Sequence, residues 1–270
     1  QSVKHWLKGG LCYSRACMAF SPRILAAGHV VNDMSIALLP RSPDNTLAIL
    51  ALLASTHVED LLRAFGDYRK IEKGAVASLP LSSEMLSSSL ASSAAKGVRA
   101  SWCLEATRET SPVFMRPGRE GERATAIGEV DHALLDIDEE SAAALFGMQQ
   151  QPVSTAKSEL TSRVLTERFP CSPEDIERDR VSYCVGLAFG RWSHEALNRG
   201  LVQEGLTSSL PLNLPPAPPG MWGPPCSVID LRPLDEGHGE DLATAVCEAM
   251  DVHFGGAQCD AVRAVLQWKF

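Results

Sequence analysis

The sequence lacks the marks of several large protein classes. Aromatic residues make up only 6% of its 270 residues, and no run of about 18 apolar residues occurs, so we expect no membrane-spanning helix and no membrane partner. The eight cysteines form no Cys-x-x-Cys pair and the histidines show no paired spacing, so no metal site is predicted. No serine lies in a nucleophile-elbow pattern, and we therefore expect no hydrolase triad.

The chain also begins without an initiator methionine and without an apolar leader ending in a small-residue cleavage site. We therefore expect it to be a fragment of a larger chain, with any active site outside it. Several cysteines, including Cys184 and Cys247, have apolar neighbours and are predicted to act as small core residues. This use of cysteine favours the reducing cytoplasm as the location of the protein.

What the sequence does contain is an ordinary globular composition with unevenly placed charge. Hydrophobic residues make up 45%, charged residues 21%, and the mean hydropathy is -0.04. The net charge is -8, but residues 1–32 contain four bases and no acid, whereas residues 201–270 contain three bases and nine acids. Because salt screens charges beyond about 8 Å, a basic beginning can bind a polyanion even when an acidic tail makes the whole chain negative.

The first eighty residues predict a small mixed unit of strands and helices. Between residues 9 and 39, short apolar groups alternate with turn residues, which is typical of several short strands joined by tight turns. A densely apolar run at 47–54 predicts a buried helix, and 57–65 predicts a second helix. The segment 71–81 is predicted as a strand and turn.

The rest of the chain predicts helices separated by irregular stretches. Residues 82–97 are rich in serine and alanine and resemble a linker, within which 84–95 has weak helical character. The prolines between 211 and 225 predict an extended connector. Helical periodicity marks six further segments: 124–135, 138–146 (capped by Asp138 and stopped by Gly147), 161–168, 176–189, 242–254 and 261–268.

These patterns predict an α+β fold, in which a small mixed strand and helix unit is followed by a mainly helical region. The expected organisation in chain order is a mixed unit at 1–82, an irregular linker at 83–123, a helical region at 124–200, a proline-rich connector at 201–228 and a truncated C-terminal helical segment at 229–270.

Three motifs that suggest chemistry are better explained by structure. Asn213-Leu214-Pro215-Pro216 is close to the Asn-Pro-Pro-aromatic signature of amino-methyltransferases, but a leucine interrupts it and no aromatic residue follows. Gly186 and Gly190 lie four residues apart in a helical pattern, which indicates close helix packing rather than a cofactor loop after a strand. The acidic run from Asp136 to Glu140 predicts a solvated helix start rather than an acid-base pair. We therefore predict no catalytic residue in this chain.

One constellation of short motifs remains, and it runs through most of the chain. Its N-terminal members are GLCYSR at 10–15, FSPRIL at 20–25, GHVVND at 28–33, the apolar helix expected at 47–54 with Ser55, KIEKG at 70–74 and LPL at 79–81. Its later members are EVD at 129–131, LFG at 145–147, VSYCVGLAFGRW at 181–192 and DEGHGEDL at 235–242. This order resembles the target-recognition region of the large adenine-specific DNA methyltransferases of BREX phage-defence systems, the PglX family, and of related type IIG restriction-modification enzymes.

The resemblance implies that this chain is the DNA-recognition portion of a site-specific adenine-N6 DNA methyltransferase. In such enzymes the target adenine is rotated out of the helix and methylated with S-adenosylmethionine, while the recognition domain holds the flanking sequence. The family's glycine-rich methyl-donor loop and intact Asn-Pro-Pro-aromatic motif are absent from this sequence, so we expect the fragment alone to be inactive. The S-adenosylmethionine site is then expected in the rest of the parent protein. The implied partners are double-stranded DNA and other proteins of the defence system.

The role implied by the resemblance needs cations that hold phosphates and side chains that read base edges. The cations expected to contact DNA are Lys4, Lys8, Arg15 and Arg23, with Arg69, Lys70 and Lys73 as a second basic cluster. His29 and Asn32, in a turn between expected strands, are the candidates for base readout. Tyr13 and Phe20 are expected in the core rather than stacked on bases. We expect the cations to share one platform within the first eighty residues.

Two other functions stay open at this point. The first is a helical protein-interaction module of a defence complex, whose acidic tail and proline-rich connector dock another protein without binding DNA. The second, a free-standing small enzyme, is disfavoured because the sequence pairs no nucleophile with a base.

Overall fold

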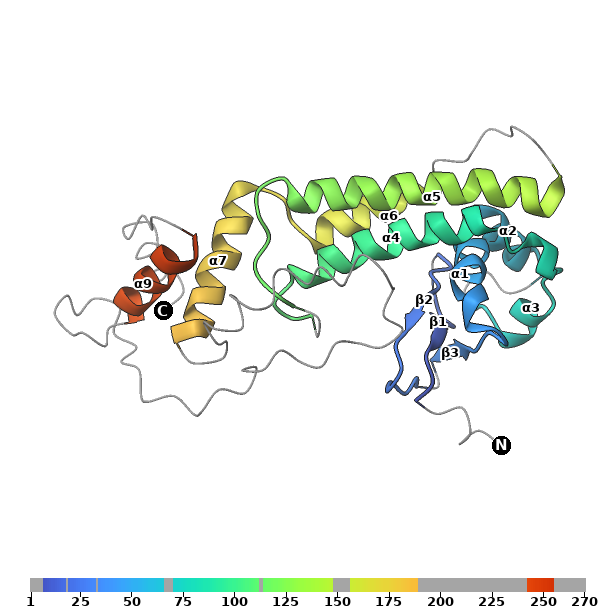
Figure 1. Cartoon of the computed structure of the whole chain (residues 1–270), viewed down its shortest axis with the longest axis horizontal. Coiled ribbons are helices and arrows are strands. Elements are labelled where there is room, and N and C mark those ends of the chain that lie inside the picture. Colours follow the sequence, from blue (N-terminus) through green and yellow to red (C-terminus); the bar gives the residue numbers. More distant parts are fainter. Residues whose placement is uncertain are drawn as a thin grey trace. The chain divides into compact units, whose positions relative to one another are not determined.

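The computed structural model describes residues 7–17, 19–32, 34–65, 70–111, 114–147, 156–188 and 242–254. The chain divides into two compact units. The sheet unit comprises Gln1–Trp102, Thr125–Arg168 and Leu206–Leu214, and the C-terminal unit comprises Cys103–Ala124, Phe169–Gly205 and Pro215–Phe270. Strands in the first unit and helices in both confirm the predicted α+β class (Figure 1). None of the described helices combines the length and the apolar composition needed to cross a bilayer.

The strands form one three-stranded antiparallel sheet in the order β2-β1-β3. They are β1 at Gly10–Ser14, β2 at Arg23–Leu25 and β3 at Ser35–Leu38, which confirms the predicted short strands between residues 9 and 39. Position 10 requires glycine, because a Cβ there would lie 2.6 Å from the carbonyl oxygen of Leu38 on β3. The backbones of β1 and β3 therefore approach closely where β1 begins.

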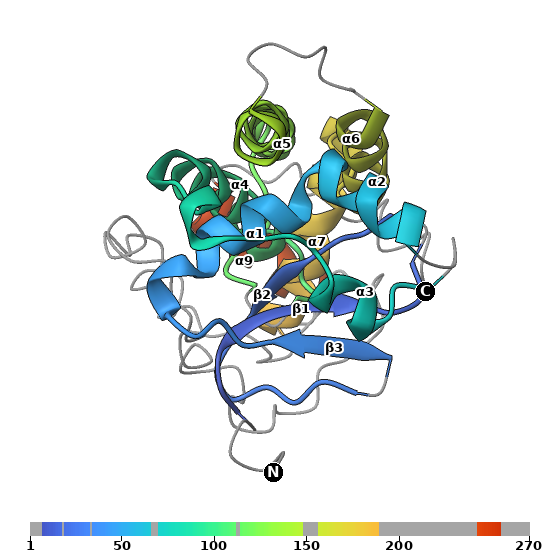
Figure 2. The same ribbon diagram turned by 90° about the vertical axis from the view of Figure 1, so that its right-hand side faces the viewer.

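Alternation along β1 gives the sheet a buried face and an outer face. Leu11 and Tyr13 are 0% and 1% exposed and lie in one core cluster with residues of α1 (Thr46–Ala54) and α2 (Thr56–Phe65). The ring of Phe20 meets that of Tyr13 edge-on, with centroids 5.1 Å apart. Both aromatic residues therefore belong to the core, and the two predicted helices are confirmed. Figure 2 shows α1 between the sheet and the longer helices of this unit.

The segment 71–81, predicted as a strand and turn, instead contains the short helix α3 at Lys73–Ala77. Ile71 and Leu79 are buried on either side of this helix. Two buried residues eight positions apart do not supply the alternating apolar face that a strand needs, and the Gly-Ala-Val-Ala sequence between them tolerates a helical turn. Two 3-10 helices precede α1 and the next long helix, η2 at Pro43–Asn45 and η3 at Ser83–Met85.

The prediction of a linker at 83–123 is wrong for its first half, which forms the 19-residue helix α4 at Ser88–Ala106. Leu90 and Ala94 of this helix are buried. A Cβ on Gly97 would lie 3.1 Å from the Cβ of Ala133, which belongs to α5 at Glu122–Phe146. Alanine is the best helix former, and small residues on one face let two helices approach closely. The serine and alanine content thus serves helix packing here.

A single helix, α5, replaces the two helices predicted at 124–135 and 138–146, and Asp138 does not cap a helix of its own. Asp138 is 5% exposed and caps α2 instead: its Oδ1 accepts from the backbone N–H of Thr56 at 2.6 Å and its Oδ2 from Thr56 Oγ1 at 2.6 Å. The predicted solvated helix start is therefore wrong at this residue, because the carboxylate serves a helix 82 positions earlier. Gly147, with φ 64°, follows α5 as predicted.

The helices predicted at 161–168, 176–189 and 242–254 are confirmed as α6 at Ala156–Arg168, α7 at Pro173–Ala188 and α9 at Leu242–Phe254. In the C-terminal unit, Tyr183 and Cys184 of α7 share a core cluster with Val246 and Met250 of α9. Gly186 of α7 is buried, and Gly190 lies outside the described residues. The proline-rich connector, the motif at Asn213 and the helix predicted at 261–268 lie outside the described residues.

A buried arginine joins three segments of the C-terminal unit. Arg123 is 3% exposed and donates from Nε and NH2 to the hydroxyl and carbonyl oxygens of Thr107 at 3.0 and 2.9 Å. Its NH1 donates to the carbonyl oxygen of Pro170 at 2.9 Å, and its NH2 to Asp179 Oδ2 at 2.6 Å. A guanidinium group is suited to this role because its five N–H donors are arranged in a fixed plane.

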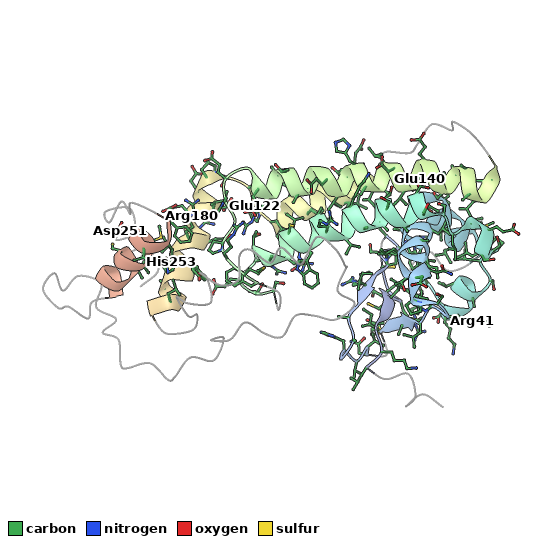
Figure 3. The ribbon with its side chains drawn as sticks, viewed as in Figure 1. Arg41, Glu122, Glu140, Arg180, Asp251 and His253 are labelled. Atoms are coloured by element: carbon green, nitrogen blue, oxygen red, sulfur yellow. The ribbon has the colours of Figure 1, made fainter. Side chains whose placement is uncertain are left out.

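Two more charged side chains of the C-terminal unit, Glu122 and Arg180, are labelled in Figure 3. Glu122 accepts from both terminal nitrogens of Arg116, at 2.8 and 2.6 Å. Burial alone raises the pKa of Glu122, but these hydrogen bonds and that from the Arg119 backbone hold the pKa below its ordinary value. The guanidinium carbon of Arg180 lies 5.3 Å from the ring centroid of Phe254. The described charges of this unit are thus largely engaged within it.

Candidate nucleic-acid interface

The start of β1 brings together two of the predicted contact residues. The backbone N–H of Gly28 donates to the carbonyl oxygen of Leu7 at 2.9 Å. Lys8 follows Leu7 in the chain and His29 follows Gly28, so Lys8 and His29 lie at the same end of the sheet. Both side chains are exposed.

Arg41 is a cation at this same end that sequence reasoning missed. Leu39, two residues before Arg41, lies against Gly10, two residues after Lys8. Arg41 is exposed and is labelled in Figure 3. The signal that would have found it is antiparallel pairing, which places the residues after β3 beside those before β1. We call Lys8, His29 and Arg41 the start cluster.

The other end of β1 gathers a second group of cations. The N–H of Arg15 donates to the carbonyl of Met34 at 2.9 Å, and the carbonyl of Arg15 accepts from the N–H of Ile71 at 2.9 Å. Ala16 and Lys70 form an antiparallel bridge. These bonds bring the chain around Lys70 and Lys73, whose side chains are exposed, to the end of β1. We call Arg15, Lys70 and Lys73 the end cluster.

Arg23 lies between the two clusters, on the outer face of the sheet. It is opposite Cys12 in the register of β1 and β2, so both side chains are on the face that Leu11 and Tyr13 do not occupy. Arg23 is exposed. Burial raises the pKa of the Cys12 thiol, and the nearby Arg23 charge opposes that rise.

Asn32 lies near the end cluster rather than beside His29. Its backbone carbonyl accepts from the N–H of Ser35 at 3.1 Å, and its Oδ1 accepts from the N–H of Met34 at 3.1 Å. The Met34 carbonyl in turn accepts from Arg15. The two residues expected to read bases are therefore both exposed but belong to opposite ends of the sheet.

The distance between the clusters is set by the length of β1. Lys8 and Arg15 are seven positions apart, and an extended chain over that interval covers about 23 Å. This corresponds to about seven base pairs along a duplex, at about 3.4 Å per pair. The structure therefore divides the candidate contact cations around the sheet between two clusters, with Arg23 between them. Lys4 and Arg69 lie outside the described residues.

One acid, Glu72, lies within the end cluster. Its Oε1 is 2.6 Å from NH2 of Arg15, and the two side chains are 52% and 37% exposed. The pKa of the buried Tyr13 hydroxyl is raised to about 12, first by burial and then by the Glu72 charge. Tyr13 is thus a neutral core residue close to a charged surface.

A separate group of charges in the sheet unit is mostly buried, with side chains 12–14% exposed. Glu59 Oε1 accepts from the N–H of Phe20 and from NH2 of Arg63, each at 3.0 Å, and its Oε2 is 3.1 Å from Lys157 Nζ. Lys157 also donates to the carbonyl of Ala54 at 2.6 Å. Burial raises the pKa of Glu59, but Lys157 and the hydrogen bonds together hold it below its ordinary value. The helical spacing of Glu59 and Arg63 is visible in the sequence, whereas the approach of Lys157 is not.

The described residues do not fit a metal ion or a nucleotide-like methyl donor. Within the described ranges, no group of three or more His, Cys, Asp or Glu side chains could hold a metal ion. The described strands are antiparallel, and in this part of the chain none leads through a glycine-rich loop into a helix, as a site for S-adenosylmethionine would require. We therefore assign no step of methyl transfer to these residues.

Comparisons with protein-family models, with curated proteins and with solved structures found no match to this chain.

Proposed function

We propose that the sheet unit binds duplex DNA as the recognition part of a site-specific, S-adenosylmethionine-dependent adenine-N6 DNA methyltransferase. The observation that carries this proposal is the exposure of Lys8, Arg23, Lys70 and Lys73 around a small sheet whose other face is buried. The motif resemblance supplies the enzyme class, and the geometry supplies a surface that suits a polyanion.

In this proposal the two basic clusters hold phosphates and the region between them meets the bases. Phosphate contacts position a protein on the duplex, while side chains in the groove read the sequence. Clusters about 23 Å apart would contact the backbone about seven base pairs apart. Arg23, on the outer face, would then be the cation best placed to contact a guanine edge, with His29 and Asn32 contributing at the two ends.

The overall negative charge of the chain does not oppose this function. Residues 1–81 contain nine bases and six acids, so this part is net positive although the whole chain carries -8. One of those acids, Glu59, is engaged in the buried network with Lys157 and Arg63. Since salt screens charges beyond about 8 Å, the local cations decide the affinity for DNA.

The chemistry itself is proposed to take place in another part of the parent protein. That part would bind S-adenosylmethionine, receive the adenine rotated out of the duplex and methylate it at N6. We propose the cytoplasm as the location, because Cys12, Cys17, Cys171 and Cys184 are free cysteines. Other proteins of a phage-defence or restriction-modification system are the expected further partners.

A helical protein-interaction module is the alternative, and one observation favours it. Leu160 and Val164, one turn apart on α6, are 37% and 49% exposed. Exposed apolar side chains on one helix face are typical of a surface that contacts another protein. This function would require no affinity for DNA.

A mobility-shift titration with a duplex of about 25 base pairs at rising salt tests the proposal. Because each lost phosphate contact reduces the slope of log K against log salt by about 0.9, Lys70→Ala with Lys73→Ala should reduce it by about 2 and weaken binding about tenfold at low salt. The matched control is Lys96→Ala with Arg99→Ala, which removes the same charge from exposed positions of α4 and should leave the slope unchanged.

The proposal would be overturned if the unaltered chain showed no detectable binding to the duplex at low salt. Equal losses in the Lys70/Lys73 and Lys96/Arg99 variants would reject the assigned surface. A stable complex with another defence protein that is lost on Leu160→Asp, in a chain that does not bind DNA, would establish the alternative.

A further inference from the structure

The end cluster contains an acid where the proposed function calls only for cations. Glu72 lies between the two exposed lysines of this cluster in the sequence, and its carboxylate contacts Arg15, the third cation, at 2.6 Å. Backbone hydrogen bonds hold the chain beside both residues of the pair. The N–H of Arg15 donates to the carbonyl of Met34, and the N–H of Ile71 donates to the carbonyl of Arg15. The backbone therefore keeps Arg15 and Glu72 beside each other at this end of the sheet.

We infer that Glu72 masks Arg15 in the free protein and releases it only when DNA provides a competing anion, an inference that rests on the proposed function. The charge of Arg15 is neutralised by a carboxylate in direct contact, so it adds little to the potential that attracts a duplex. The pair is half exposed on each side, and such pairs are weak in water. A phosphate or a guanine edge can therefore replace the carboxylate.

This arrangement reduces binding to DNA of the wrong sequence. Non-specific affinity comes almost entirely from cations that neutralise phosphates. An acid that neutralises one cation lowers that affinity, whereas a correctly placed base edge can still engage the guanidinium group. Glu72 is thus a specificity-determining residue that acts through Arg15.

The lysines of the end cluster are not expected to be masked in this way. Lys70 and Lys73 are exposed, and no ion pair joins either side chain to Glu72 within the described residues. Removing the Glu72 charge should therefore act mainly through Arg15. This expectation makes the double variant Arg15→Ala with Glu72→Gln the decisive one.

The experiment measures affinity for a random-sequence duplex of about 25 base pairs as a function of salt. Glu72→Gln should tighten binding about three- to tenfold at low salt and steepen the slope of log K against log salt by about 1, because one more cation becomes available. Glu139→Gln, the same change at an exposed position of α5, should alter the affinity less than twofold. In an Arg15→Ala background, Glu72→Gln should have no such effect.

The possible results separate this inference from the proposed function. If the unaltered chain does not bind the duplex at low salt, the proposed function and the inference both fail. If the chain binds and Glu72→Gln behaves like Glu139→Gln, only the inference is overturned. A gain that persists in the Arg15→Ala background would also overturn it, because Glu72 would then act by simple repulsion. A change in fold alone would not steepen the salt slope, so that slope distinguishes masking from a structural role.

Discussion

Two sets of basic residues, one from each unit of this protein, lie in opposite environments. In the sheet unit, Lys8, Arg23, Lys70 and Lys73 are exposed at the ends and outer face of a small sheet. In the C-terminal unit, Arg123 is 3% exposed and makes four hydrogen bonds. A basic residue stabilises the fold where its N–H donors are satisfied within the protein, and it is available to a partner where those donors face water.

Removing the side chain of Arg123 should reduce the stability of the protein more than any other substitution considered below. Arg123→Ala should lower the free energy of unfolding by about 3 kcal/mol, because it leaves the buried carbonyl of Thr107 and the part-buried carbonyl of Pro170 without their donor. Urea denaturation followed by circular dichroism measures this loss. The matched control is Arg178→Ala, whose exposed ion pair with Asp175 on the same helix should contribute less than about 1 kcal/mol. Similar losses in both variants would contradict a special role for the buried arginine.

A smaller loss is expected when the acid that caps α2 is removed from the sheet unit. Asp138→Ala should cost about 2 kcal/mol, because the N–H and hydroxyl of Thr56 lose their acceptor. Asp138→Asn keeps one acceptor oxygen and should cost less. Glu139→Ala, at the exposed neighbouring position, is the control and should be nearly neutral in the same urea titration. An Asp138→Ala variant as stable as Glu139→Ala would show that the cap does not matter.

The buried thiol of the C-terminal unit should make stability depend on pH at the alkaline end. Burial raises the pKa of Cys184 to about 12, so this thiol stays protonated in the fold but ionises in the unfolded chain near pH 8.5. Its contribution is therefore complete below pH 8.5 and is lost as the pH rises, by about 1 kcal/mol between pH 8.5 and 9.5. Unfolding titrations across this range should show a shallower decline for Cys184→Ala than for the exposed control Cys103→Ala. Parallel declines in the two variants would count against this assignment.

The smallest expected effect on stability is at the exposed cations of the sheet unit. Lys70→Ala and Lys73→Ala should each change the free energy of unfolding by no more than about 0.5 kcal/mol, because neither side chain is buried. Thermal unfolding of these variants beside Arg123→Ala compares the loss of stability at exposed basic residues with the loss at a buried one. A loss of 2 kcal/mol or more at either lysine would mean that the end cluster serves the fold rather than a ligand.

The local sequence pattern was sufficient to predict those strands and helices whose neighbours in the sequence are also their neighbours in space. The short strands β1, β2 and β3 follow from apolar groups between turn residues, and α7 and α9 follow from helical periodicity within a few residues of their ends. The segment around Lys73 was predicted wrongly, because Ile71 and Leu79 reach the core from either side of a helical turn. A pair of buried residues does not show by itself whether the chain between them is extended or coiled.

The candidate interface was only partly predictable for the same reason. Lys8, Arg15 and Arg23 are basic residues in the right part of the chain, and the sequence alone indicated them. Arg41 was missed because it joins the start cluster only through the pairing of β3 with β1. The ion pair of Arg15 with Glu72 spans 57 positions and likewise has no local signal.

Composition and periodicity were enough to establish that this chain forms an α+β protein with a basic beginning and many helices. These properties depend on each residue's own preferences and on neighbours within about one or two turns. The tertiary structure alone decided that Asp138 caps α2, that Glu72 neutralises Arg15, and that the cations divide between the two ends of β1. Each of these depends on which distant side chain fills the space beside a charge, and that is settled only when the helices and strands pack.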